Sequence, residues 1–400
     1  MTFLNVMPGS VVPKIEVRID FNNDPTAGTV LWTDVTPYVT AYSRAAVRSN
    51  EFDHPGVTGG AVTLRNDDGR FSPDNQAGTF YGKLKKMRRI QVRAQWGTMI
   101  DDRYTGYVQD WPQTWAQAGK DQTVTLPLVD AFEPLSLYDL VGQDFGAASS
   151  GSAIADVLAA AGVTTSSLDA GLSSIPDSGT LTSTFALQRL HDIAATENGV
   201  CYPDGGGAVV FHDRRHRLAT SGTVMGTIGD AAGEIRYVDT VPAFGDAWPI
   251  VRVTANGGTT ETATVDAGTA SFFQRTLNFP PSGSYLVTSQ AETLDAAYYL
   301  ANRYADPQTR IQTVTLVPAR DPTMWPAALG LDTSTRVLFR RRAWGGTIET
   351  AQFVEGYGDQ VTIGQDWRIP VSLSPADPQS YWLAGDPVYG LAGETTRAGY

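Results

Sequence analysis

The densest group of imidazole and carboxylate side chains in the sequence has the chemistry to bind a metal ion. It comprises His191, His212, Asp213 and His216. His212 and His216 are four residues apart, and on a helix this spacing places both imidazoles on one face, as a zinc site requires. The same stretch, 212–217, reads HDRRHR, and its three arginines would repel a divalent cation. We therefore predict a solvated turn after a hairpin and no metal ion.

A second group offers oxygen ligands of the kind that calcium prefers. These are Asn66, Asp67, Asp68, Asp74 and Asn75. Their spacing differs from that of the EF-hand loop. The run Asn66-Asp67-Asp68-Gly69 is typical of a tight turn because glycine tolerates a positive φ, and apolar residues flank it on both sides. We predict a hairpin turn here, with Phe71 on the second strand.

Motifs for covalent catalysis are incomplete. Asp177-Ser178-Gly179-Thr180 matches the string around an aspartic-protease carboxylate, but that chemistry needs two such aspartates sharing one proton. The nearest second string, 266–269, reads DAGT and lacks the hydroxyl residue. No G-x-S-x-G, P-loop or H-E-x-x-H motif occurs, and a pair of glycosidase carboxylates has no sequence signature. Cys201 lies between apolar neighbours and is predicted to be a core residue. We expect no catalytic residue, no cofactor and no metal ion, and hence no enzyme.

Three basic clusters interrupt an acidic chain. They are Lys83, Lys85, Lys86, Arg88 and Arg89; Arg214, Arg215 and Arg217; and Arg340, Arg341 and Arg342. Such clusters suit contact with acidic patches of neighbouring subunits, and they equally suit solvated strand ends. The sequence leaves both interpretations open.

The composition narrows the classes of partner. The 400 residues carry 42 Asp and Glu against 30 Lys and Arg, a formal net charge of −12. Nucleic acids and anionic membranes require a cationic surface, so we expect neither as a main partner. No run approaches the roughly 18 apolar residues of a membrane-spanning helix, and no export signal is evident at the N-terminus. A single cysteine excludes an internal disulfide.

The elements that position these side chains indicate a mainly β chain with a small α/β insertion. Strands are expected at 15–19, 89–95, 103–111 and 122–129. We predict four regions: an N-terminal β domain at 1–145, an inserted α/β domain at 146–215, a second β domain at 216–373 and an extension at 374–400.

Helix signals are few. In the insertion, one helix is expected to begin at an N-cap Ser152 and another to span 184–197, before a hairpin that turns at 203–207. A helix at 290–305, capped by Ser289, interrupts the second β domain. The string QTVTL recurs at 122–126 and 312–316, which is compatible with two copies of one barrel.

Several motifs resemble one family. The stretches LWTDVTPYV at 31–39 and GGAVTLRNDDGRFSPDN at 59–75 resemble the N-terminal domain of minor tail proteins of long-tailed actinobacterial phages, a family that includes the tail-tip baseplate hub. The helix at 291–304 with the strand at 311–316, and the segments 353–357 and 382–386, are similar to later parts of the same family.

The resemblance implies two tail-tube-like β-barrels around a small α/β insertion, assembled as a trimer into a pseudo-hexameric ring. It implies a structural virion protein at the tail tip, assembled in the host cytoplasm beside the distal tail protein and the tape measure protein. DNA would pass through the lumen without specific binding.

Two alternatives remain. The distal tail protein of such a particle forms a hexameric ring, and a ring of six copies would favour it. A carbohydrate-binding or cell-wall-degrading tail protein is suggested by nine tryptophans in a glycine-rich β chain, although only Trp111 and Trp115 are close in sequence.

Overall fold

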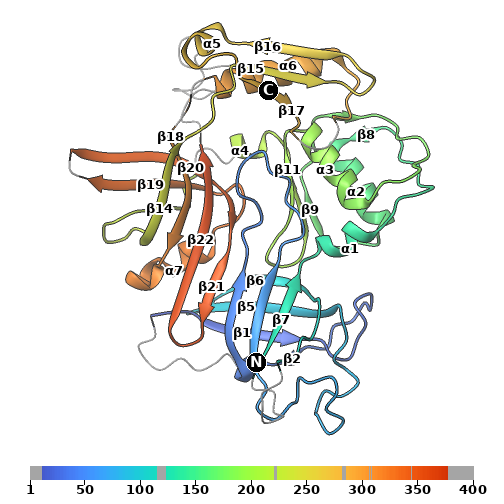
Figure 1. Cartoon of the computed structure of the whole chain (residues 1–400), viewed down its shortest axis with the longest axis vertical. Helices are drawn as coiled ribbons and strands as arrows, with labels where there is room; N and C mark the ends of the chain where they lie inside the picture. The colour runs from blue at the N-terminus through green and yellow to red at the C-terminus, as the bar shows by residue number, and fades with distance from the viewer. Residues whose placement is uncertain are drawn as a thin grey trace.

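The computed structural model describes residues 11–114, 123–219, 223–281, 285–305, 307, 309–343 and 345–376. The described part is mainly β, and one continuous 14-stranded sheet forms its frame. Figure 1 shows this frame below and to the left, with two smaller α/β units beside and above it. Trp115, Gln122 of the first QTVTL string and residues 377–400 of the expected C-terminal extension lie outside the described residues.

The first part of the sheet has the order β2-β1-β5-β6-β7-β4-β3. Its strands are β1 (Lys14–Ile19), β2 (Thr33–Asp34), β3 (Val39–Arg44), β4 (Gly60–Arg65), β5 (Arg88–Trp96), β6 (Met99–Val108) and β7 (Thr123–Val129), with the 3-10 helix η1 (Thr36–Tyr38) before β3. Ile15, Val17 and Ile19 are buried, as the alternation in the sequence predicts. Gly97, at a φ of 59°, provides the tight turn between β5 and β6.

The turn at Asn66–Gly69 is present, but the hairpin predicted around it is wrong. Gly69 has a φ of 66°, yet no strand follows before β5. The side-chain oxygen of Asn66 accepts the backbone N–H of Phe71 at 2.8 Å, and its amide donates to Ser72 at 2.9 Å. Because Asn66 takes the Phe71 N–H, that group is not available to a strand partner, and the Phe71 ring folds back into the core.

The second part of the sheet comes from the C-terminal half of the chain. It contains β13 (Gly226–Ile228), β14 (Tyr237–Phe244), β18 (Thr309–Leu316), β19 (Arg336–Ala343), β20 (Gly346–Tyr357), β21 (Asp359–Thr362) and β22 (Asp366–Pro375). Strand β22 pairs with β20 and β18, and β18 pairs with β14. A bridge between Ile228 and Ile235 brings β13 close to the start of β14.

One strand joins the two parts. β21 pairs with β22 on one side and with β3 on the other. A single apolar core therefore extends through both parts, from Val17 to Leu373. The helices η2 (Pro318–Arg320), η3 (Pro322–Met324) and α7 (Trp325–Leu329) pack against it, and the buried indole of Trp325 lies between those of Trp96 and Trp367.

The first α/β unit occupies the right side of Figure 1. Its elements are α1 (Phe132–Leu137), β8 (Ala148–Ser149), α2 (Ser150–Ala160), β9 (Ser166–Leu168), β10 (Ser174–Ile175), α3 (Ala186–Thr196), β11 (Val200–Pro203) and β12 (Val209–His212), followed by α4 (His216–Ala219). Both helices and the hairpin expected in the insertion are confirmed. The N-cap of α2 is Ser149 and not Ser152, because the Ser149 hydroxyl accepts the N–H of Ser152.

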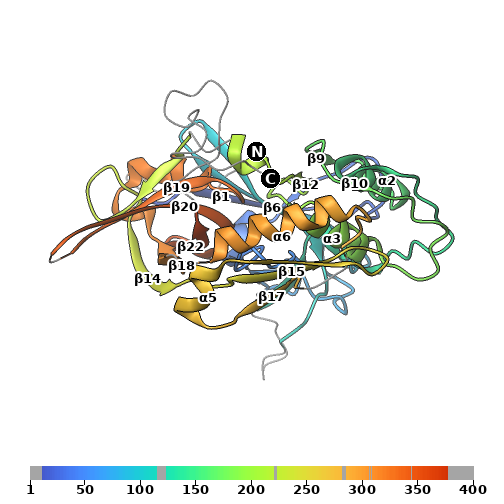
Figure 2. The ribbon, with the colours of Figure 1, turned by 90° about the horizontal axis from the view of Figure 1, so that it is seen from above.

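A second α/β unit, with its own core, lies within the region 216–373 that the sequence pattern treats as one β domain. It contains β15 (Ile250–Thr254), β16 (Thr260–Thr264), α5 (Asp266–Phe272), β17 (Thr276–Phe279) and α6 (Gln290–Tyr304). Helix α6 confirms the helix predicted there, and the Ser289 hydroxyl accepts the N–H of Glu292 as its cap. Figure 2 shows α6 lying across this small sheet. None of the described helices is both long enough and apolar enough to cross a lipid bilayer.

Candidate functional site

The three histidines of the predicted metal-type cluster do not come together in the structure. His212 and His216 stack on each other, whereas His191 stacks on His54. The rings of His212 and His216 lie 3.4 Å apart and nearly parallel, and His216 Nδ1 lies 2.9 Å from the Asp169 carboxylate. His191 lies elsewhere, stacked on His54 at 5.4 Å. Burial, with a further contribution from His216, lowers the pKa of His212 to about 3, so its ring is neutral at pH 7. Among the described residues, no three His, Cys, Asp or Glu side chains converge as a metal site would require.

The other motifs are held by local hydrogen bonds. Asp68 pairs with Arg70, whose hydrogen bond lowers the pKa of that carboxyl group. Asn75 donates to the carbonyl of Gly69 at 3.0 Å. Asp177 accepts the N–H of Gly179 at 2.7 Å as part of a loop. Cys201 is buried in the core of the first α/β unit, where burial raises its thiol pKa to about 12. A thiol of this kind is protonated and unreactive at neutral pH.

Two of the basic clusters make their ion pairs within the chain. Arg214 lies 2.8 Å from Glu197 and 3.2 Å from Glu292. In the cluster at 340–342, Arg340 and Arg342 both contact Glu234. Arg214, Arg340 and Arg342 therefore have carboxylate partners within the chain, although Arg342 is still 41% exposed near the end of β19.

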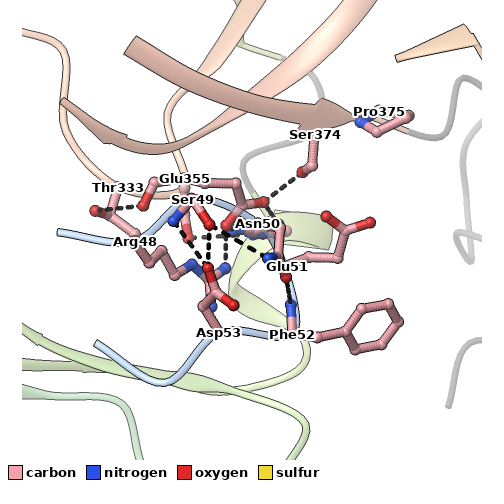
Figure 3. A network of polar contacts seen from close by, with 12 residues as sticks. Arg48, Ser49, Asn50, Glu51, Phe52, Asp53, Thr333, Glu355, Ser374 and Pro375 are labelled. Carbon is pink, nitrogen blue, oxygen red and sulfur yellow. Dashed lines mark hydrogen bonds and ion pairs between the residues drawn. The ribbon is translucent and has the colours of Figure 1, made fainter. Parts of the chain in front are cut away.

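A buried network of ion pairs surrounds Glu355 on β20. The carboxylate contacts Arg48 and Arg217 and accepts a hydrogen bond from Ser374. Figure 3 shows Glu355 between Arg48 and Ser374, with Thr333 near its backbone. Burial alone would raise the pKa of Glu355, but the two guanidinium groups hold it well below its usual value. One carboxylate thus ties the segment after β3, helix α4 and the second part of the sheet together.

A second buried network joins the two parts of the sheet directly. Arg103 on β6 makes a bidentate pair with Asp359 on β21, at 3.0 and 3.1 Å, and both side chains are fully buried. The indole N–H of Trp367 donates to the same carboxylate at 2.9 Å. The ring of Tyr357 lies between two guanidinium groups, with Arg44 at 4.5 Å and Arg103 at 4.4 Å from its centroid. Such pairs fix one arrangement, because separating them would leave unpaired charges buried.

A third network links the two α/β units. The Glu197 carboxylate, at the end of α3, accepts from Ser150 at 2.5 Å, from the backbone N–H of Ser173 at 2.7 Å and from Arg214. Arg214 also reaches Glu292 in the first turn of α6. Burial opposes ionisation of Glu197, but Arg214 and the hydrogen bonds lower its pKa.

A cavity of about 800 Å³ lies beside the Glu355 network. Its wall includes residues 47–54, Trp248 and Tyr304. The wall carries equal numbers of arginines and carboxylates, namely Arg48, Arg303 and Arg310 with Glu51, Asp53 and Asp246. Glu51 lies 3.0 Å from Arg310, and Asp246 lies 2.8 Å from Arg275 outside the wall. The cavity therefore presents no excess of one charge to an ionic ligand, and its polar wall suits ordered water.

The chemistry of the three networks is that of a rigid scaffold. The charged groups of each network bond to one another within the chain, which fixes the elements that carry them. Sequence reasoning missed Arg44, Arg103, Glu355 and Asp359 because their partners are far apart in sequence. The only available signal was the presence of charged residues inside strands that otherwise alternate.

Comparison with known proteins finds solved structures with a similar fold. No protein-family model and no curated protein matches the sequence. Among solved structures, the chain is similar to a tail protein from Neisseria meningitidis MC58, at 12% identity and a TM-score of 0.58, over 91% of this chain and 97% of that one. It is also similar to the 43 kDa tail protein of prophage MuSo2 from Shewanella oneidensis, at 13% identity and a TM-score of 0.55, over 90% of this chain and 97% of that one. The chain shares its fold with these tail proteins over about nine-tenths of its length.

Proposed function

We propose that this chain is a structural subunit of a phage tail, located at the tail tip as a hub that continues the tail tube. The observation that carries the proposal is the match in fold to two tail proteins over 90% or more of this chain. The resemblance of the stretch 59–75 to minor tail proteins of long-tailed actinobacterial phages supports the finer assignment. In this role the chain is not an enzyme.

The buried networks support a mechanical role. Arg103 with Asp359, and Glu355 with its two arginines, fix the parts of the chain in one arrangement. A subunit that must hold a tube open under load needs fixed geometry more than it needs a reactive group.

In the proposed assembly, three copies form a pseudo-hexameric ring from two tube-like barrels each. The ring contacts the distal tail protein and the tape measure protein, and DNA passes through its lumen. A formal charge of −12 per chain suits such a passage. An acidic surface does not neutralise DNA phosphates and so gains no affinity from the release of counterions.

Purified phage tails test the proposal. Antibody labelling should place the chain at the tip, and quantitative mass spectrometry should give three copies per tail. A count of six would favour the distal tail protein. Absence of the chain from purified tails would contradict the tail role altogether.

A further inference from the structure

An exposed apolar surface lies at the outer corner of the first α/β unit. We call it the corner patch, made of Leu137, Tyr138, Val141 and Phe185. Leu137 is 68% exposed, Val141 53% and Phe185 49%. Two segments distant in sequence are held together here, since the N–H of Ala186 donates to Tyr138 at 2.9 Å and Asp139 bridges to Phe185. Clustered exposed apolar side chains of this size mark an interaction surface.

The corner patch belongs to an acidic stretch of the chain. From residue 131 to residue 188 the chain has no lysine or arginine, and it has these six acidic residues: Glu133, Asp139, Asp144, Asp156, Asp169 and Asp177. Asp139, which bridges to Phe185 of the patch, and Asp144, three residues after Val141, are both exposed. A matching partner surface would be apolar with a positive charge.

The second surface is the far end of the β19–β20 hairpin, residues 340–350, which we call the ribbon. Beyond residue 339 on β19 and before residue 352 on β20, these strands pair only with each other within the described part of the chain. In Figure 1 the ribbon projects to the left, at the opposite end of the molecule from α1, and Figure 2 agrees. A bare two-stranded ribbon gains stability when one face is covered.

The two faces of the ribbon differ. Arg340 and Arg342 turn toward the chain's own Glu234. Arg341 and Ile348 are directly opposed in the strand register, so their side chains share the other face. Arg341 is exposed, with no ion pair to any described residue, and Ile348 is 49% exposed. This face combines an apolar side chain with an available cation.

We propose that the ribbon of one copy docks on the corner patch of a second copy of this chain. Ile348 would cover the apolar side chains of the patch, and Arg341 would meet Asp139 or Asp144. The two surfaces complement each other in charge, and each chain carries both. Because they lie at opposite ends, the contact is head-to-tail, and a head-to-tail contact builds a ring when the rotation between successive copies closes. The inference deepens the ring assembly proposed above and rests on it.

Paired variants of the full chain test this docking by native mass spectrometry. The ribbon variant carries Arg341→Glu and Ile348→Asp, and the patch variant carries Val141→Asp and Phe185→Asp. We expect the wild type to be a closed oligomer and each variant alone to be a monomer. Mixed together, the variants should stop at a heterodimer, because each retains one intact surface.

Matched controls separate docking from general surface effects. Leu31→Asp changes an aliphatic side chain that is 53% exposed in the loop before β2, and Arg252→Glu reverses an exposed charge on β15. Both should leave the oligomer intact, and circular dichroism should show native folding throughout. Oligomers that persist in both paired variants would overturn the docking. So would a wild-type chain that is monomeric at micromolar concentration, or a wild-type chain that assembles only with another tail protein.

Cross-linking provides a readout that tolerates imperfect variants. Cys201 is buried, so Ile348→Cys with Val141→Cys adds the only accessible thiols of the described residues. A short bis-maleimide should yield covalent oligomers, whereas Ile348→Cys with Leu31→Cys should not. If the chain is found in purified tails but these variants show no contact, only the docking is wrong. If it is absent from tails, the proposed function fails independently.

Discussion

Glu355 is a buried carboxylate whose charge is balanced by two arginines. It is fully buried against Arg48 and Arg217. Glu355→Gln keeps the shape and removes the charge, leaving two guanidinium groups without their counterion. We expect the free energy of unfolding to fall by about 3–5 kcal/mol, as when one partner of a buried ion pair is removed.

Urea denaturation followed by tryptophan fluorescence measures this loss. The matched control is Glu349→Gln, which removes a half-exposed carboxylate beside Arg340 on the ribbon. The control should be nearly neutral because surface ion pairs contribute little. Equal losses for the two variants would refute the special role of Glu355.

The His212 ring makes stability depend on pH. Its pKa is lowered to about 3 by burial and by His216, with Arg217 and Arg48 also lowering it and Asp169 raising it. In the unfolded chain the imidazole titrates near its ordinary value of 6.5. As pH falls below that value, the unfolded state binds the proton first, so stability decreases with acidification.

Comparing the parent with His212→Gln isolates the contribution of His212 to the pH dependence of the unfolding free energy. Between pH 7 and pH 5 the parent should lose about 2 kcal/mol more unfolding free energy than the variant. Asp130, whose pKa burial raises to about 6, acts in the opposite direction in both proteins and cancels in the comparison. Parallel pH profiles would contradict a buried neutral His212.

At the scale of elements, the β11–β12 turn fixes the first α/β unit to the sheet. A Cβ on Gly205 would lie 1.9 Å from the carbonyl oxygen of Asp102 on β6, a clash with backbone. Gly205→Ala should therefore weaken the packing of the first α/β unit on the sheet and increase proteolysis between that unit and the sheet. A Cβ on Gly206, in the same turn, would meet only the Asp204 side chain at 3.3 Å. Gly206→Ala should therefore increase proteolysis much less. Limited trypsin digestion compares them, and identical digestion patterns would count against the close contact.

The sequence predicted elements whose signals are local. Helices α2, α3 and α6, the β11–β12 hairpin and most strands of the first part of the sheet follow from caps, periodicity and turn residues. The prediction of a hairpin after β4 was wrong because the side chain of Asn66 accepts the Phe71 N–H that a strand partner would use. The networks of Arg103 and Glu355 had no local signal, since their partners lie 256 and 307 positions away.

At the scale of the whole molecule, the two parts of the sheet share one core. We predict that residues 1–145 expressed alone do not fold, because β3 would lose β21 and Arg103 would be buried without Asp359. A dispersed amide spectrum for this fragment, like that of an independent domain, would contradict the shared core. The full chain, under the same conditions, provides the reference spectrum.

The pairing of β3 with β21 also has a consequence in time. During synthesis, β3 leaves the ribosome long before Asp359 does. At typical elongation rates, roughly 10 to 50 seconds separate the completion of β7 from the arrival of β21. Throughout that interval the first part of the sheet has an open edge and an incomplete core, so the nascent chain is exposed to mispairing until β21 emerges.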